Sequence, residues 1–227
     1  MTSLLKLASF PIGNLACNCS VIYSSQTREA IAIDPGNDAD SFLKKIKTLD
    51  VQVKYLLHTH AHFDHIGHSD IVRTKIGAPL HLHKDDLFLY RALREQGLFF
   101  GQQVGEPGEV DHYIEDEEEY KIQVQNLEIK DQGLQTILKT IHTPGHTPGS
   151  CSFYTELLED GPMLFTGDTL FSGTIGRTDL PGGDFHQLIH SIQTRILKLP
   201  EETTCIPGHG AQTTLSNEKR YNPFLKK

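Results

Sequence analysis

The chain has 227 residues, of which 37% are hydrophobic and 22% are charged. This size suits one large globular domain or two small ones, and because no linker or internal repeat is visible we expect a single domain over residues 1–227. The formal net charge of −8 argues against a nucleic-acid-binding protein, which normally carries a basic surface. No stretch approaches the roughly 18 apolar residues of a membrane span, and the N-terminus lacks a signal-peptide pattern.

These features predict a cytoplasmic protein that binds neither nucleic acid nor membrane and that forms a monomer or a small homo-oligomer. The four cysteines form neither a C-x-x-C pair nor a dense framework, so we expect reduced thiols rather than disulfides. One count stands out from the composition, because the chain contains thirteen histidines.

The first part of the chain alternates short apolar runs with turns, which predicts antiparallel strands over 4–10, 19–24 and 30–33. A helix is then expected over 38–50, where Asp38 or Asp40 can cap its start. A short buried strand over 53–57 leads into a histidine-rich run. The segment that follows, 66–79, is predicted to be helical and to end at its Gly-Ala-Pro sequence.

The segment 84–119 begins with a helical pattern and then loses it, and its acidic run 115–119 is predicted to be a solvated surface. Strands return over 120–124, 126–131, 134–142, 149–155 and 163–168. An amphipathic helix is expected over 184–199, followed by a strand over 203–208 and a short helix before 222–227. The order of elements predicts an α/β sandwich of two mixed sheets with helices outside.

Four of the expected strands end in turns that carry potential metal ligands. The first turn belongs to the run "HTHAHFDHIGH" from His58 to His68, and the others contain "PGH", "GD" and "PGH". Strand ends often gather at one edge of a sheet, where loops carry function. The candidate ligands are His60, His62, Asp64, His65, His146, Asp168 and His209.

The spacing of these residues has a chemical interpretation. His60 and His62 project to one side of an extended backbone, whereas Asp64 and His65 can face a second ion from a tight turn. Five imidazoles and two carboxylates suit zinc first, with iron and manganese as alternatives. The set exceeds one tetrahedral zinc, and two ions about 3.5–4 Å apart that share a carboxylate would use it fully. A lone His-x-His pair is more often ordinary surface or core, but four ligand-bearing strand ends favour a metal site.

The motif "THAHFDH" over 59–65, together with His146, Asp168 and His209 in their glycine-containing turns, resembles the metallo-β-lactamase superfamily. The resemblance implies a four-layered αβ/βα sandwich with a dinuclear site at one edge. It implies that one ion is bound by His60, His62 and His146, and that the other is bound by Asp64, His65 and His209. Asp168 would bridge the two ions.

Within that superfamily, the segment 165–184 and the ending "NPFL" resemble small bacterial glyoxalase II-like hydrolases. The resemblance implies hydrolysis of S-lactoylglutathione to D-lactate and glutathione, by attack of a hydroxide that bridges the two ions. Most of the C-terminal helical domain of longer glyoxalase II proteins is absent. Asp168 stands where many zinc β-lactamases have cysteine, so antibiotic hydrolysis is not expected, and the chain has no room for the extra domain of RNA-processing members.

Three alternatives to a thioester hydrolase stay open at this point. Persulfide dioxygenases use a single iron and share a Gly-Arg-Thr-Asp segment like residues 176–179. A lactonase or another ester hydrolase would use the same nucleophile. A metal-binding module without activity is a different class, which the intact ligand set argues against.

Arg177 follows the expected bridging aspartate and has two interpretations. Its guanidinium could bind a substrate carboxylate, or it could pair with Asp179 or Asp184 and brace the loop. His58, His68 and His142 are expected to orient the metal ligands. The remaining histidines are expected to be ordinary surface or packing residues, namely His81, His83, His112, His186 and His190.

Overall fold

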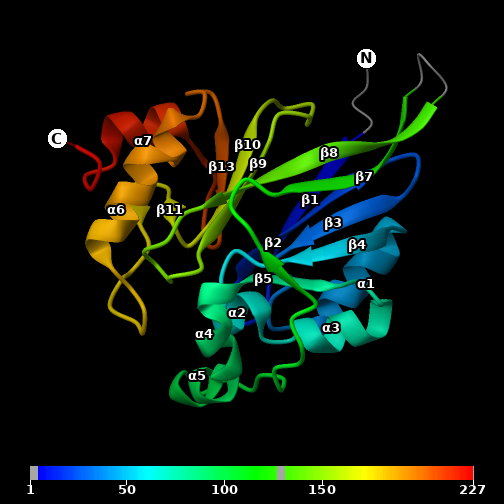
Figure 1. Cartoon of the computed structure of the whole chain (residues 1–227), viewed down its shortest axis with the longest axis horizontal. Helices are drawn as coiled ribbons and strands as arrows, with labels where there is room; N and C mark the ends of the chain where they lie inside the picture. Colours follow the sequence, from blue (N-terminus) through cyan, green and yellow to red (C-terminus); the bar gives the residue numbers. More distant parts are fainter. Residues whose placement is uncertain (1–4, 127–130, 227) are drawn as a thin grey trace.

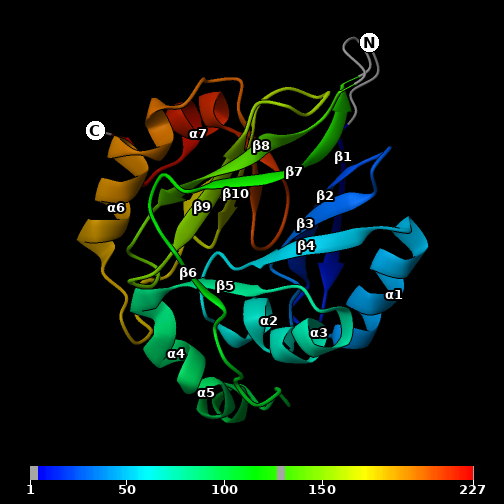
Figure 2. The same cartoon turned by 45° about the vertical axis from the view of Figure 1, so that its right-hand side comes forward.

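The computed structural model describes residues 5–126 and 131–226 and contains two six-stranded mixed sheets packed face to face, with helices on their outer sides (Figures 1 and 2). The predicted sandwich of two mixed sheets with flanking helices is therefore confirmed. The strand expected over 126–131 lies, except for its two end residues, outside the described residues.

The first sheet contains the strands of the N-terminal half in the order β1-β2-β3-β4-β5-β6. The pairs β1/β2 and β2/β3 are antiparallel, as expected, and the three pairs that follow are parallel. The strands are β1 (Leu5–Ile12), β2 (Cys17–Ser24), β3 (Glu29–Ile33), β4 (Gln52–Leu57), β5 (Leu80–His83) and β6 (His112–Ile114).

The second sheet has the order β14-β13-β10-β9-β8-β7, in which only β10/β13 is a parallel pair. The strands β11 (Leu170–Phe171) and β12 (Thr174–Ile175) pair only with each other, and this ribbon lies next to β10 and β13 of the second sheet. The strands of the large sheet are β7 (Glu119–Asn126), β8 (Asp131–His142), β9 (Cys151–Thr155), β10 (Met163–Gly167), β13 (Thr204–Pro207) and β14 (Thr213–Thr214).

The helices form the two outer layers, with α1 and α3 beside the first sheet and α6 and α7 beside the second (Figure 2). The helices are α1 (Ala39–Leu49), α2 (Phe63–Ile66), α3 (Ser69–Ile76), α4 (Leu87–Arg91), α5 (Leu93–Phe99), α6 (Phe185–Thr194) and α7 (Leu215–Tyr221), with single 3₁₀ turns over Lys84–Asp86 and Ile196–Lys198. In the described ranges, none of these helices has the length and apolar character needed to cross a bilayer.

The alternation of side chains along β3 shows how both faces of a sheet become buried. Ile31 and Ile33 belong to the core between the sheets, whereas Ala30 and Ala32 face the outer helices. Those small side chains leave room for Phe42 of α1, which is fully buried. Asp38 caps α1 as expected, because its carboxylate accepts a hydrogen bond from the backbone N–H of Ser41 at 3.0 Å.

The segment 84–119 differs most from a simple sequence pattern. It forms two short helices, α4 and α5, followed by irregular chain and strand β6. The strands β5 and β6 were not predicted, since runs of three or four residues carry little periodicity. The helix expected from residue 66 instead begins at Ser69, because the chain first completes the separate turn α2.

The core between the sheets should carry most of the stability. Phe153 is fully buried there, and truncation to alanine leaves a cavity, so Phe153→Ala should lower the free energy of unfolding by about 3–5 kcal/mol. The matched change Phe185→Ala, at a side chain that is 46% exposed, should cost less than about 1 kcal/mol. Urea unfolding of both variants checks this, and equal losses would contradict the assigned core.

Candidate metal centre

All seven candidate ligands lie just beyond strand ends or in the turn that follows one, at one edge of the sandwich. His60 and His62 follow β4, and the one-turn helix α2 carries Asp64 and His65 directly after them. His146 lies in the turn between β8 and β9, Asp168 directly follows β10, and His209 follows β13. The structure therefore brings together residues that are up to 149 positions apart, as the strand-end pattern predicts.

Three imidazoles form the first cluster. His146 Nε2 lies 2.9 Å from His62 Nδ1 and 3.3 Å from His60 Nε2. All three rings are buried, and their facing nitrogen atoms lie within 4.8 Å of one another. Three nitrogen atoms that point at a common centre form one face of a tetrahedral metal site.

The second cluster consists of Asp64, His65 and His209, whose ligand atoms also lie within 4.8 Å of one another. His209 Nε2 is 2.9 Å from Asp64 Oδ2, and His65 Nε2 is 3.7 Å from the same oxygen. The sequence-predicted division of the seven residues into two sets of three with one residue between them therefore corresponds to two clusters in the structure.

Asp168 lies between the two clusters and faces both. Its Oδ2 is 3.6 Å from His146 Nε2, while its Oδ1 is 3.4 Å from His65 Nε2 and 3.9 Å from His209 Nε2. Gly208 makes this approach possible, because a Cβ there would lie 2.2 Å from Asp168 Oδ1 and 2.6 Å from His65 Cε1. A carboxylate in this position can share its two oxygens between two cations.

The outer nitrogen of several rings is held by an oxygen acceptor, which leaves the inner nitrogen free to bind a cation. His146 Nδ1 donates to the backbone carbonyl of Arg177 at 2.7 Å, and His209 Nδ1 donates to that of Leu15 at 3.0 Å. His65 Nδ1 donates to Asp34 Oδ2 at 2.9 Å. Such contacts fix the tautomer and the ring orientation of a metal-binding histidine.

The pKa values of His60 and His62, in the first cluster, agree with this arrangement. Burial and the neighbouring His146 ring lower the pKa of His62 to about 3, and burial lowers the pKa of His60 well below its ordinary value. Both imidazoles are therefore neutral and keep a lone pair.

In the second cluster burial opposes the charged form of the imidazoles, but neighbouring anionic groups still raise the pKa of His65 and of His209 above the ordinary value. Burial also disfavours the charged form of Asp168, but His65 and the other nearby imidazoles hold the pKa of that carboxyl far below its usual range.

Two unpartnered atoms show that the residues fit bound cations. His65 Nε2 and Asp168 Oδ1 are buried and have no hydrogen-bond partner. Leaving a buried polar atom unsatisfied is costly, and a cation between the two atoms would satisfy both. The donor set of imidazole nitrogens and carboxylate oxygens suits borderline divalent metals such as zinc or iron.

Two buried aspartates that support the site were not identified from the sequence. Asp34, which follows β3, accepts hydrogen bonds from Thr59 N at 2.8 Å and Thr59 Oγ1 at 2.7 Å in addition to His65. Its position was detectable, because "AIAID" is another apolar strand that ends in a potential ligand.

Asp86 connects the two loops that carry the first cluster. Its Oδ2 accepts from Ala61 N at 2.9 Å and from Thr147 Oγ1 at 2.8 Å, and its Oδ1 accepts from Gly149 N at 2.7 Å. Ala61 separates His60 from His62, and Thr147 follows His146. Burial raises the pKa of Asp86 to about 6, and the three donors oppose that rise. No local sequence pattern indicates this role.

The side chains of Arg177 and His58, which the sequence singled out beside the candidate ligands, form hydrogen bonds outside the two clusters. The guanidinium of Arg177 pairs with both carboxylate oxygens of Asp179, at 2.7 and 2.8 Å, so the bracing contact is present. His58 was expected to orient a ligand ring, but its hydrogen bonds go to His81 O and Ser69 Oγ instead.

Two further histidines expected to orient ligands have no hydrogen bond to a ligand ring among the described residues. His68 accepts a hydrogen bond from Ala39 N and so supports the start of α1. His142 donates to the carbonyl of Pro148 at 2.9 Å, within the same turn as His146, and its ring stacks on His83.

A chamber of about 140 Å³ opens beside the two clusters. His62, Asp64, His146 and Asp168 form its polar side, and Arg177 also lines it. A small polar group can therefore reach the candidate ligands from solvent.

Comparisons with known proteins agree with this site. A model of the Metallo-beta-lactamase superfamily matches residues 12–209. The chain is 37% identical over 223 residues to the Hydroxyacylglutathione hydrolase GloC of Haemophilus influenzae, a match that covers 97% of this chain and 98% of that protein.

Two solved structures are similar over nearly the whole chain. One is the crystal structure of BLEG-1 B3 metallo-beta-lactamase, with 36% identity, a TM-score of 0.84 and coverage of 98% of this chain and all of that one. The other is TTHA1623 in a di-iron-bound form, with 32% identity, a TM-score of 0.82 and coverage of 96% and 100%. The two sheets, the flanking helices and the histidine-aspartate edge define a metallo-hydrolase. The chain belongs to the Metallo-beta-lactamase superfamily.

Asp86 offers a test of how the loops hold the first cluster. Asp86→Ala leaves three buried donors unpaired and frees two ligand loops, so zinc affinity should fall about tenfold or more. Competition with a coloured chelator measures the affinity, and circular dichroism verifies that the variant is folded. Asp85→Ala, at the exposed neighbouring carboxylate, is the matched control and should leave the affinity unchanged. A folded Asp86→Ala protein with wild-type affinity would contradict this role.

Proposed function

We propose that the chain is a dinuclear metal hydrolase that cleaves a glutathione thioester, S-lactoylglutathione, to D-lactate and glutathione. The observation that carries the proposal is the position of Asp168 between two three-residue clusters beside an open chamber. The identity to a protein named hydroxyacylglutathione hydrolase supports the choice of substrate. The di-iron form of TTHA1623 supports a pair of ions and makes iron an alternative to zinc.

When bound, two divalent ions would lower the pKa of a water molecule to about 7 and polarise the thioester carbonyl. The chain's own residues hold the ligand rings in position. The carbonyls of Arg177 and Leu15 and the Asp34 carboxylate hold the rings, so no reorientation of the donors is needed during the reaction.

The leaving group explains why the site needs no separate general acid. Thioester cleavage releases a thiolate whose parent thiol has a pKa of about 8.5, so it departs without being protonated first. Asp64 and Asp168 are the carboxylates nearest the reacting atoms in this proposal, and they would offset part of the charge of two bound divalent ions.

A steady-state comparison tests the proposed substrate. Protein of measured metal content should cleave S-lactoylglutathione, lose at least 90% of that activity with a chelator, and regain it when zinc is returned. The loss is expected because the described residues that line the chamber include no serine, threonine or cysteine that could act as a nucleophile. Unaltered hydrolysis by metal-free protein would refute the mechanism.

Two other substrate classes should be measured with the same preparation. One tightly bound iron together with persulfide-dependent oxygen uptake would indicate a persulfide dioxygenase instead of a hydrolase. Turnover of a lactone alone would indicate a lactonase. The similarity to the BLEG-1 B3 metallo-beta-lactamase makes β-lactam hydrolysis a second candidate, which a chromogenic cephalosporin tests directly. A metal-loaded protein inert on all of these compounds would support a binding module.

Arg177 is proposed to bind a carboxylate of the substrate, because its side chain lines the chamber and is 54% exposed. Arg177→Ala should then raise KM about fivefold or more with little change in kcat, since the carbonyl that holds His146 is retained. Asp179→Ala removes the competing partner and should leave KM unchanged or lower it. An unchanged KM for Arg177→Ala with a reduced melting temperature would assign the residue to bracing alone.

A further inference from the structure

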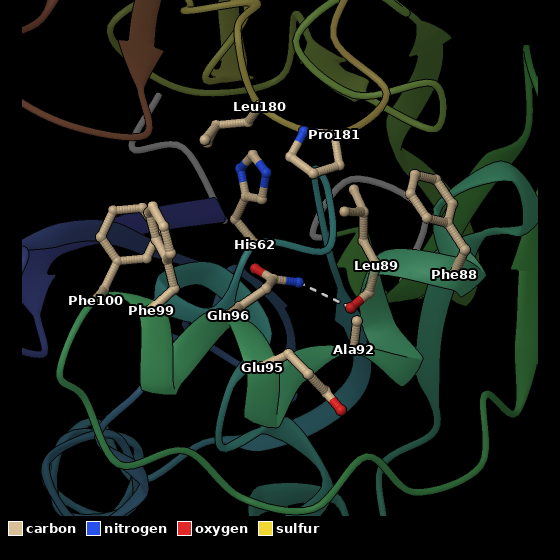
Figure 3. A pocket seen from close by; sticks show the side chains of 10 residues that line it. All are labelled: His62, Phe88, Leu89, Ala92, Glu95, Gln96, Phe99, Phe100, Leu180 and Pro181. Carbon is tan, nitrogen blue, oxygen red and sulfur yellow. Dashed lines mark hydrogen bonds between the residues drawn. The ribbon is translucent and has the colours of Figure 1, made fainter.

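A second cavity, of about 290 Å³, lies next to the chamber and is almost entirely apolar (Figure 3). Side chains of α4 and α5 form one wall, and Leu180 and Pro181 form the opposite wall, with the ring of His62 between them. Residues 88–100, part of a segment to which the sequence assigned no role, therefore form an apolar surface beside the candidate ligand His62.

The apolar cavity adjoins the reaction chamber. The same four residues line both spaces, namely His62, Gln96, Phe100 and Leu180. A molecule whose carbonyl lies against the two clusters can therefore extend one of its substituents into the apolar cavity without leaving the site.

Among the described residues that form the walls of this cavity, the polar amide of Gln96 is already used at both ends within the protein. Its Nε2 donates to Ala61 O and Leu89 O, and its Oε1 accepts from Phe63 N. Three aromatic rings complete the lining, those of Phe88, Phe99 and Phe100, which are 47%, 79% and 41% exposed.

The apolar cavity and the chamber also differ in the charged residues that line them. Among the described lining residues of the apolar cavity there is no lysine or arginine, and Glu95 contributes a carboxylate. A glutathione group, which carries two carboxylates, is disfavoured there because the lining offers those carboxylates no cationic partner and places the Glu95 carboxylate near them. The chamber has the guanidinium of Arg177 instead.

We propose that the apolar cavity binds the acyl chain of the thioester, so that the enzyme prefers unbranched acyl groups of about four to eight carbons to the lactoyl group. This inference depends on the proposed thioesterase function and names the substrate class of the same site. In the reaction the C–S bond breaks and a C–O bond forms with water, which yields a carboxylic acid and glutathione with no change of oxidation state.

Acyl-chain length is the direct variable to test. For S-acetyl-, S-butanoyl- and S-hexanoylglutathione, kcat/KM should rise roughly threefold per added methylene, because each methylene leaves water for the cavity. Ala92 lines the cavity, so Ala92→Phe should fill it and remove the dependence on chain length. Leu98→Phe adds bulk to α5, the helix that begins directly after Ala92, at a side chain that is 77% exposed and outside the lining, and it should behave as wild type.

Binding of thioethers, which the enzyme cannot cleave, tests the acyl pocket independently of the proposed reaction. S-hexylglutathione should bind metal-loaded protein at least tenfold more tightly than S-methylglutathione, with a negative heat-capacity change, and Ala92→Phe should remove the difference. Calorimetry measures both quantities without requiring turnover.

The outcomes are distinct. Hydrolysis of every acyl length at one rate, with equal binding of the two thioethers, overturns the acyl pocket and leaves the thioesterase intact. Tighter binding of S-hexylglutathione without cleavage of any thioester supports the pocket and overturns the reaction. An increase in kcat/KM that depends on an apolar thiol portion instead of the acyl chain overturns the acyl assignment. A dimer that buries the cavity in solution overturns it as well.

Discussion

The structure depends on imidazoles and carboxylates being packed together at one buried edge. His60, His62 and His146 direct lone pairs at a common centre, and Asp168 separates them from a second cluster. Neither arrangement is favourable without a positive charge, because facing lone pairs repel and buried carboxylates need partners. A bound cation removes both costs. The same cation would therefore stabilise this edge of the fold and take part in the reaction there.

The fold provides this convergence through the ends of its strands. Loops from both sheets reach the same edge, and the hydrogen bonds of Asp34 and Asp86 fix the loops to one another before any ligand binds. Close approach is possible at Gly208, where any side chain would collide with Asp168. Preorganised donors of this kind bind a metal without a further loss of conformational freedom. Beside them, α4 and α5 add an apolar wall, which gives the site a polar and an apolar compartment.

The sequence was sufficient to predict the sandwich, most of the long strands and helices, and the seven residues that gather at the edge. Their signals are local, because an apolar strand followed by a histidine or aspartate in a glycine-containing turn can be recognised within ten residues. The supporting contacts could not be predicted in that way. Asp86 acts through hydrogen bonds to backbone 25 and 63 positions away, and His146 is held by a carbonyl, which every residue possesses. The apolar cavity likewise depends on how short helices pack, which periodicity does not encode.

Anomalous diffraction from crystals of the metal-loaded protein tests the central claim most directly. Data collected on both sides of the zinc or iron absorption edge should show two peaks about 3.5–4 Å apart, one within each three-residue cluster and both beside Asp168. A single peak confined to His60, His62 and His146 would contradict the dinuclear centre. The absence of any peak at this edge, in protein that retains its thioesterase activity, would contradict the account as a whole.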